Sequence, residues 1–138
     1  MKLFYTVIFL LSLASAAFAR EEAVLARITS YSAGEGSKYA STGQRLHSGH
    51  CAVDPKRIAY GSKVVFPDRA CTAVDTGPAV VSRKSARACG RTASQRNAIV
   101  VDRFFETKRE AMDWTNTHPE FMTLHVVSPG SHSEPSEL

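Results

Sequence analysis

The chain has 138 residues and carries 17 basic against 13 acidic side chains, a formal net charge of +4. So small an excess is not typical of nucleic-acid-binding proteins, and the length suits one domain with one modest core. We therefore expect a single-domain protein, a monomer, without a nucleic-acid partner.

The first 19 residues are typical of a secretory signal. Lys2 precedes an apolar stretch from Leu3 to Leu13, and Ala17 and Ala19 fit the A-x-A cleavage pattern. Cleavage after Ala19 would leave a domain at 20–127. Nothing later is long or apolar enough to span a membrane, and no cysteine stands at the cleavage site. We predict a secreted or periplasmic protein without a stable membrane anchor.

Short apolar runs rich in β-branched and aromatic residues predict strands, because each run is bounded by turn residues. The expected strands are Val24–Tyr31, Ser62–Phe66, Ala70–Val74, Ala98–Val101 and Phe121–Val127. Many short strands at close intervals predict a small β-barrel or sandwich.

One helix is expected, from Thr107 to Thr117. Its first residues, Thr-Lys-Arg-Glu, have the form of a capping box, and Pro119 follows its end. Trp114 within it is interpreted as a core residue, with sugar stacking as the alternative. The segment 128–138 is polar and predicts a disordered tail.

Three aspartates each close a short apolar run and open a turn: Asp54, Asp75 and Asp102. Such repeated endings suggest carboxylates gathered at one pole of a β-fold. Gathered carboxylates raise one another's pKa, which suits acid catalysis. A Ca²⁺ site built from the three acids is an alternative, although the sequence has no Asp-x-Asp ligand loop.

The three cysteines, Cys51, Cys71 and Cys89, allow at most one intramolecular disulfide, and export makes one possible. We favour Cys71 with Cys89, a bridge that would tether the segment after Asp75. Zinc bound by His47, His50 and Cys51 is the rival interpretation, but this spacing matches no standard zinc pattern. No metal or other cofactor is expected.

Basic residues concentrate in one stretch whose only acid is Asp102: Arg83, Lys84, Arg87, Arg91, Arg96 and Arg103. A solvated loop explains this pattern most simply. The functional alternative is a rim that attracts an anionic polymer, with a strength that falls as salt rises. No aromatic residue separates the first five of these charges, which argues against single-stranded nucleic acid as the partner.

Six short motifs follow one another between roughly Ile28 and Val127. They are Thr29-Ser30-Tyr31, Ser41-Thr42-Gly43, Ala52-Val53-Asp54-Pro55, Gly61-Ser62-Lys63-Val64, Ala73-Val74-Asp75-Thr76-Gly77 and Val101-Asp102-Arg103-Phe104-Phe105. In these motifs and their order the chain resembles the 3D domain family, which is named for three aspartates and related to murein hydrolases of the membrane-bound lytic transglycosylase A type.

The resemblance implies a mainly β fold, a six-stranded double-psi β-barrel with one short helix. It implies an exported enzyme that acts on the glycan strands of peptidoglycan and cleaves the bond between N-acetylmuramic acid and N-acetylglucosamine without water. One aspartic acid then serves as acid and as base, unlike the carboxylate pair of most glycoside hydrolases. A non-catalytic glycan-binding barrel of the expansin kind is the alternative.

The third aspartate of the family is its usual acid, and it corresponds to Asp102. Asp75 is expected to stay ionised and to support positive charge that develops on the sugar. Thr42, Asp54 and Arg103 are candidate substrate-binding residues, although a Thr-Gly turn and an Asp-Pro turn explain the first two more simply.

The chain departs from the family between Asp75 and Asp102, where Ser82 to Asn97 is an apparent insertion. Pro78 also replaces a family glycine. The insertion is either a disturbance of the catalytic geometry or a specificity element whose arginines meet substrate carboxylates.

Overall fold

The computed structural model describes residues 20–36 and 38–130. The predicted signal, 1–19, and the part of the predicted tail from 131 to 138 lie outside the described residues.

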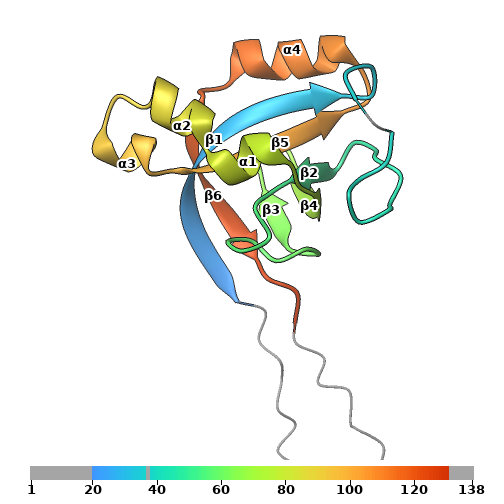
Figure 1. Cartoon of the computed structure of the whole chain (residues 1–138), viewed down its shortest axis with the longest axis horizontal. Helices are drawn as coiled ribbons and strands as arrows, with labels where there is room; N and C mark the ends of the chain where they lie inside the picture. The colour runs from blue at the N-terminus through green and yellow to red at the C-terminus, as the bar shows by residue number, and fades with distance from the viewer. Residues whose placement is uncertain (1–19, 37, 131–138) are drawn as a thin grey trace, which may run out of the picture.

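Six strands form a closed barrel in the order β1-β5-β2-β4-β3-β6 (Figure 1). They are β1 (Glu21–Ser32), β2 (His50–Ala52), β3 (Lys63–Val65), β4 (Ala70–Asp75), β5 (Ile99–Phe105) and β6 (Phe121–Val127). The first half of β1 pairs antiparallel with β6 and its second half pairs parallel with β5. The mainly β prediction and the barrel option are confirmed.

Alternation along the strands sorts side chains between the barrel interior and its outer surface. Ala26 and Ile28 of β1, Cys71 of β4 and Val101 of β5 belong to the main core cluster. Val100 and Phe104 of β5 point the other way and pack into two smaller clusters outside the barrel. The barrel therefore carries apolar patches on both surfaces of β5.

Strand β5 is longer than the sequence predicted. It continues through Asp102 to Phe105, so the expectation that Asp102 opens a turn is wrong. Asp102 pairs with Thr29 of β1 on one side and with Ala52 of β2 on the other. The strand continues because Phe104 and Phe105 are both buried, one on each surface.

Helix α4 (Lys108–Thr117) begins and ends where the sequence predicted. The Thr107 hydroxyl accepts a hydrogen bond from the Glu110 amide at 3.2 Å, which is the capping contact expected of a Thr at this position. Trp114 is 8 % exposed and lies in the main core, so its interpretation as a core residue is confirmed.

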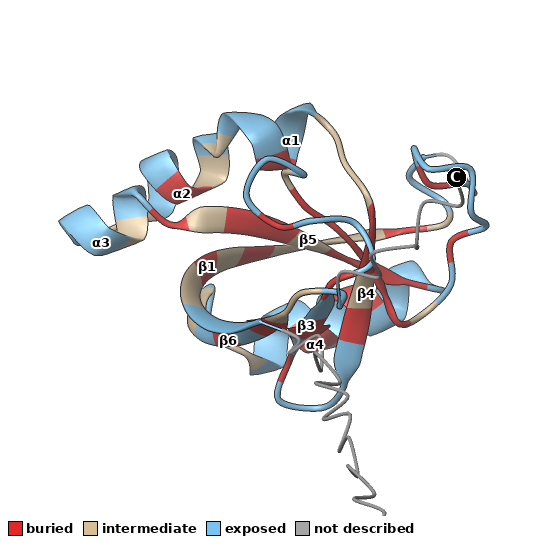
Figure 2. Cartoon of the chain, turned by 90° about the horizontal axis from the view of Figure 1, so that it is seen from below, coloured by how far each residue is buried: buried red, intermediate tan, exposed pale blue. Residues whose placement is uncertain are grey.

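The expectation of a single helix is wrong, because three further short helices lie between β4 and β5. They are α1 (Pro78–Ser82), α2 (Lys84–Cys89) and α3 (Ala93–Arg96). Val80 and Ala86 bury one side of this segment, and most of its other residues are exposed, as Figure 2 shows for α2 and α3. With only two buried residues, so short a segment has no repeating pattern of apolar positions from which its helices could be predicted.

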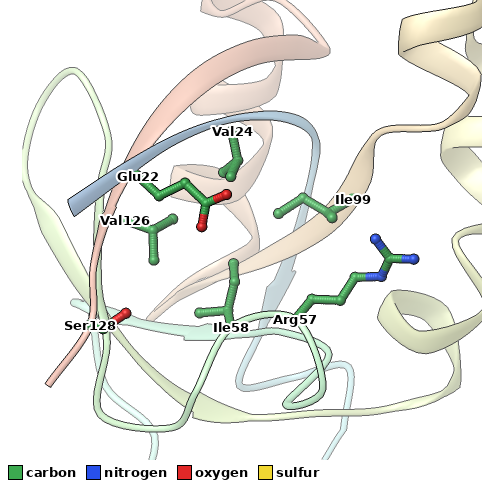
Figure 3. Close-up of a pocket in the computed structure, with 7 residues that line it drawn as sticks. All are labelled: Glu22, Val24, Arg57, Ile58, Ile99, Val126 and Ser128. Carbon is green, nitrogen blue, oxygen red and sulfur yellow. The ribbon is translucent and has the colours of Figure 1, made fainter. Parts of the chain in front are cut away.

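A cavity of about 230 Å³ opens at the end of the barrel where β1 and β5 begin and β6 ends (Figure 3). Val24, Ile58, Ile99 and Val126 give it an apolar lining, and the Glu22 carboxylate points towards them. None of the predicted site residues lines this cavity.

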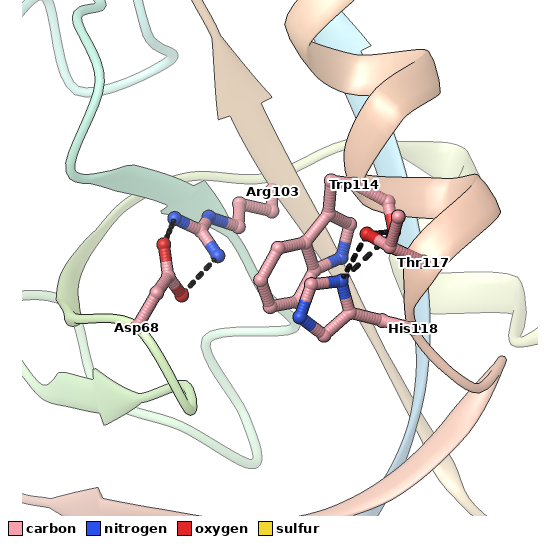
Figure 4. A network of polar contacts seen from close by, with 5 residues as sticks. All are labelled: Asp68, Arg103, Trp114, Thr117 and His118. Atoms are coloured by element: carbon pink, nitrogen blue, oxygen red, sulfur yellow. Dashed lines mark hydrogen bonds and ion pairs between the residues drawn. The ribbon is translucent and has the colours of Figure 1, made fainter.

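Arg103, a candidate substrate-binding residue, is enclosed by the barrel and its helix. Its side chain is 4 % exposed and donates two hydrogen bonds to Asp68, at 2.8 and 2.7 Å (Figure 4). The guanidinium also lies 4.3 Å from the Trp114 ring and 4.8 Å from the rings of Phe66 and Phe105. This planar cation suits a buried site because it stacks on aromatic rings and binds a carboxylate through two bonds.

Replacing Asp68 with Asn should destabilise the fold by roughly 2–4 kcal/mol, because it leaves the Arg103 cation buried without its counter-ion. The double variant Asp68→Asn with Arg103→Met should recover much of this loss, since no uncompensated charge remains. Thermal or urea unfolding measures both, with Asp113→Asn, an exposed acid on α4, as the matched control. A double variant no more stable than Asp68→Asn would contradict the explanation.

Candidate functional site

Asp75 and Asp102 lie at the same level on the two strands that flank β2. Ala52 of β2 pairs with Asp102 on one side and with Asp75 on the other, and a register shift after Cys51 brings Asp75 opposite Ala52. Neighbouring strands lie roughly 4.8 Å apart, so the two aspartate backbones are about 10 Å apart. The methyl side chain of Ala52 lies between them and is buried, and it packs in one cluster with Val80 and Val100.

Asp102 projects from the outer surface of β5 between two apolar clusters. Val100, two residues before it, packs with Val80 and Ala86, and Phe104, two residues after it, packs with Leu46. Burial between these clusters raises the pKa of Asp102 to about 6. The hydrogen bond that its Oδ1 accepts from the Thr29 hydroxyl at 2.9 Å lowers the pKa, and the charge of Asp75 raises it.

Asp75 has a different environment, in which three donors surround its carboxylate. Its Oδ2 accepts a hydrogen bond from the Tyr31 hydroxyl at 3.0 Å, and its Oδ1 accepts from the amides of Ser41 at 2.8 Å and Thr76 at 2.9 Å. The site therefore holds one acid that favours its proton and one carboxylate that is built to accept hydrogen bonds.

Tyr31 is a site residue that sequence reasoning assigned only to a strand. Burial, and then the neighbouring Asp75, raise the pKa of the Tyr31 hydroxyl well above its ordinary value, so it remains a donor. Its ring packs edge-on against Phe104 with centroids 5.2 Å apart. The signal available in the sequence was Thr29 and Tyr31 at i and i+2, which place two hydroxyls on the same surface of one strand.

Thr42 supports the site through the backbone. Its hydroxyl donates to the Val74 carbonyl at 2.7 Å and so fastens the loop after β1 onto β4. The same loop supplies the Ser41 amide to Asp75. Gly43 follows at a φ of 90°, which suits the Thr-Gly turn considered in the sequence.

Asp54 has the contacts of a turn residue. Its Oδ1 accepts from the Lys56 amide at 3.0 Å, and its carbonyl accepts from the amides of Arg57 and Ile58 at 2.9 Å. These bonds close the turn after β2, as expected of Asp before Pro55. The structural interpretation of Asp54 explains all of these contacts.

The predicted disulfide between Cys71 and Cys89 is not formed, and all three cysteines are free. Cys71 is fully buried inside the barrel with Cys51, whereas Cys89 is exposed at the end of α2, outside the barrel. Burial raises the pKa of both interior thiols, which disfavours their reactive thiolate form.

The His47 and His50 rings lie with their centroids 3.7 Å apart, and His50 Nδ1 accepts from the His47 amide at 3.3 Å. Within residues 20–36 and 38–130, no group of three or more His, Cys, Asp or Glu side chains is arranged to hold a metal ion. In the same part of the chain, no helix has the length and apolar character needed to cross a membrane.

Comparison with known proteins gives no match to a family and none to a curated protein. The interpretation of the site therefore rests on its own geometry and on the sequence motifs.

Replacing Asp102 with Asn should stabilise the fold by about 3 kcal/mol at pH 8, since the folded state then no longer holds a buried charge. The folded pKa, about 6, lies above the unfolded value, so the wild-type protein should lose stability as pH rises from about 4 to about 6 and then level off. The Asn variant, which keeps an acceptor for Thr29, should lack this step.

Thermal unfolding between pH 4 and pH 8 measures the effect, and Asp54→Asn is the matched control because its amide oxygen preserves the turn bond. An identical pH step in the wild-type and Asp102→Asn proteins would contradict the raised pKa of Asp102.

Proposed function

We propose that this protein is an exported lytic transglycosylase that cleaves peptidoglycan glycan strands and leaves 1,6-anhydro-N-acetylmuramic ends, with Asp102 as acid and then base. The observation that carries the proposal is the contrast between the two carboxyl groups flanking Ala52. Asp102 is half-buried with a pKa of about 6, and Asp75 is surrounded by donors. A carboxyl group whose pKa lies well above the ordinary value can act as the acid on a glycosidic bond.

The proposed reaction begins with protonated Asp102, which donates its proton to the glycosidic oxygen as the bond to the muramyl C1 breaks. Positive charge then develops on the sugar ring, and the Asp75 carboxylate stabilises it. The Asp102 carboxylate next takes the proton of the muramyl C6 hydroxyl as that oxygen bonds to C1. One bond to C1 is broken and one is formed, and Asp102 ends in its starting form without water or a cofactor.

The fold supports the proposal in a second respect. We infer that the barrel is of the double-psi type, on the basis of its closed six-strand order and its two parallel pairs, β1 with β5 and β2 with β4. This arrangement brings strands from distant parts of the sequence beside one another. It is the reason that Thr29 and Asp102, 73 residues apart, share a hydrogen bond.

Digestion of purified peptidoglycan by the chain from residue 20 onward tests the reaction. Mass spectrometry should find soluble products one water lighter than those of a muramidase, and the Asp102→Asn variant should release none. Release by the Asn variant at the wild-type rate would exclude Asp102 as the acid. Binding without release by the wild-type protein would favour a non-catalytic glycan-binding barrel.

The rate of release should fall roughly tenfold per pH unit above about pH 6, because the first step needs protonated Asp102.

Tyr31→Phe, which removes one donor from Asp75, should lower kcat by roughly tenfold or more at the optimum. Tyr60→Phe, at a partly exposed tyrosine, is the matched control and should match the wild-type rate. A Tyr31→Phe protein with unchanged kcat would argue against a role for the Tyr31 bond to Asp75.

A further inference from the structure

The segment that forms α1, α2 and α3 carries charge of one sign only. Between Thr76 and Val101 the sequence has five basic residues and no acidic one. The basic residues are Arg83, Lys84, Arg87, Arg91 and Arg96. We call the segment from Pro78 to Arg96 the basic arm. Solvated surfaces usually mix both signs of charge, so five uninterrupted cations create a positive potential over this part of the molecule.

Helices α1 and α2 of the basic arm pack on β5, the strand that carries Asp102. The first residue of the arm comes three positions after Asp75 and its last comes six positions before Asp102, so both of its ends connect to site strands. Val80 and Ala86, 2 % and 0 % exposed, pack against Val100 on the surface of β5 that also carries Asp102. Two residues along a strand span about 7 Å, so α1 and α2 pack within one such step of Asp102.

Hydrogen bonds to backbone carbonyls and a helix cap hold the arm together, and its basic side chains do not pair with acidic ones. The Arg83 guanidinium donates to the Asn97 carbonyl at 3.0 Å, the Arg87 guanidinium donates to the Ser82 carbonyl, and Thr92 caps α3. In the described part of the chain, none of the five basic side chains forms an ion pair with a carboxylate. Lys84, Arg91 and Arg96 are exposed.

The chemistry of the arm suits carboxylates. Arginine presents N–H groups in a planar fork that matches the two oxygens of a carboxylate. Phosphate matches the same fork, but a nucleic-acid strand also needs surfaces on which its bases stack, and the arm from Pro78 to Arg96 has no aromatic residue.

We propose that the basic arm binds the peptide-stem carboxylates of the polymer whose glycan strand lies at Asp102. The inference rests on the proposed function for the identity of the polymer, but not on catalysis. The protein should therefore bind glycan that still carries its peptide stems more tightly than glycan from which the stems have been removed.

Three neutral substitutions test the arm without disturbing its internal contacts: Lys84→Gln, Arg91→Gln and Arg96→Gln. The matched control is Lys56→Gln, Arg57→Gln and Arg109→Gln. These three residues are exposed and lie outside the arm, and their substitution removes the same amount of charge. A third variant, Arg91→Lys with Arg96→Lys, keeps the charge. All proteins carry Asp102→Asn, so that the polymer is not consumed, and equal thermal unfolding midpoints verify that each is folded.

Cosedimentation measures binding to two probes, purified peptidoglycan with its peptide stems and the same glycan stripped of stems by an amidase. The parent protein should bind the intact polymer more tightly, with an affinity that falls as salt rises. The arm variant should lose roughly tenfold in affinity for the intact polymer, because three exposed ion pairs each contribute a modest factor. The control variant should bind like the parent. The charge-keeping variant should bind more weakly than the parent but more tightly than the arm variant, because lysine keeps the charge and lacks the planar fork of arginine.

Equal loss in the arm and control variants would mean that net charge alone acts, and equal binding of the two polymers by the parent would remove the stems as ligand. Tighter binding to single-stranded DNA of matched charge than to the intact polymer would also overturn the proposal.

Binding to soluble poly-γ-glutamate separates the proposal for the basic arm from the proposed enzyme activity. If binding depends on the arm but the wild-type protein does not digest peptidoglycan, the proposal for the arm is supported and the proposed enzyme activity is not. If the wild-type protein digests peptidoglycan and the arm substitutions change neither binding nor digestion, the enzyme activity is supported and the proposal for the arm is not.

Discussion

The site depends on one constraint, the partial removal of the Asp102 carboxyl from water. Val100 and Phe104 lie on the same surface of β5 as Asp102, and each is buried in its own apolar cluster. A single hydrogen bond from Thr29 is too little to offset this burial, so the carboxyl holds its proton to a higher pH than an ordinary aspartate. The ionised, buried Asp102 lowers the stability of the folded state above pH 6, and the same burial keeps the carboxyl protonated below that pH.

The barrel explains why two carboxyls in similar positions behave differently. Asp75 ends β4, where the chain turns and backbone amides become available, and it collects two of them in addition to the Tyr31 hydroxyl. Asp102 lies inside β5, where the backbone amides are already used in the sheet. Position within a strand therefore decides which carboxyl has free backbone amides beside it and which does not.

Much of the barrel could be predicted from the sequence, because β-branched runs bounded by turns, and the Thr107 cap, are local signals. The inward position of Arg103 could not, since it depends on Asp68, 35 residues away, and on three aromatic rings that only the fold brings together. The disulfide prediction failed for the same reason, because spacing cannot tell an interior strand residue such as Cys71 from an exposed one such as Cys89. Of the site, Asp75 and Asp102 were predicted, and the donors on β1 that distinguish them were not.

Asp102 should be protonated at a pH where ordinary aspartates are ionised. Titration of the protein labelled with ¹³C at the aspartate side-chain carboxyls, followed by NMR, tests it most directly, with the Asp102 signal assigned by its absence from Asp102→Asn. We predict a midpoint of about 6 for Asp102. A midpoint near the ordinary value of about 4 would contradict it, because Asp102 would then hold no proton to donate at neutral pH.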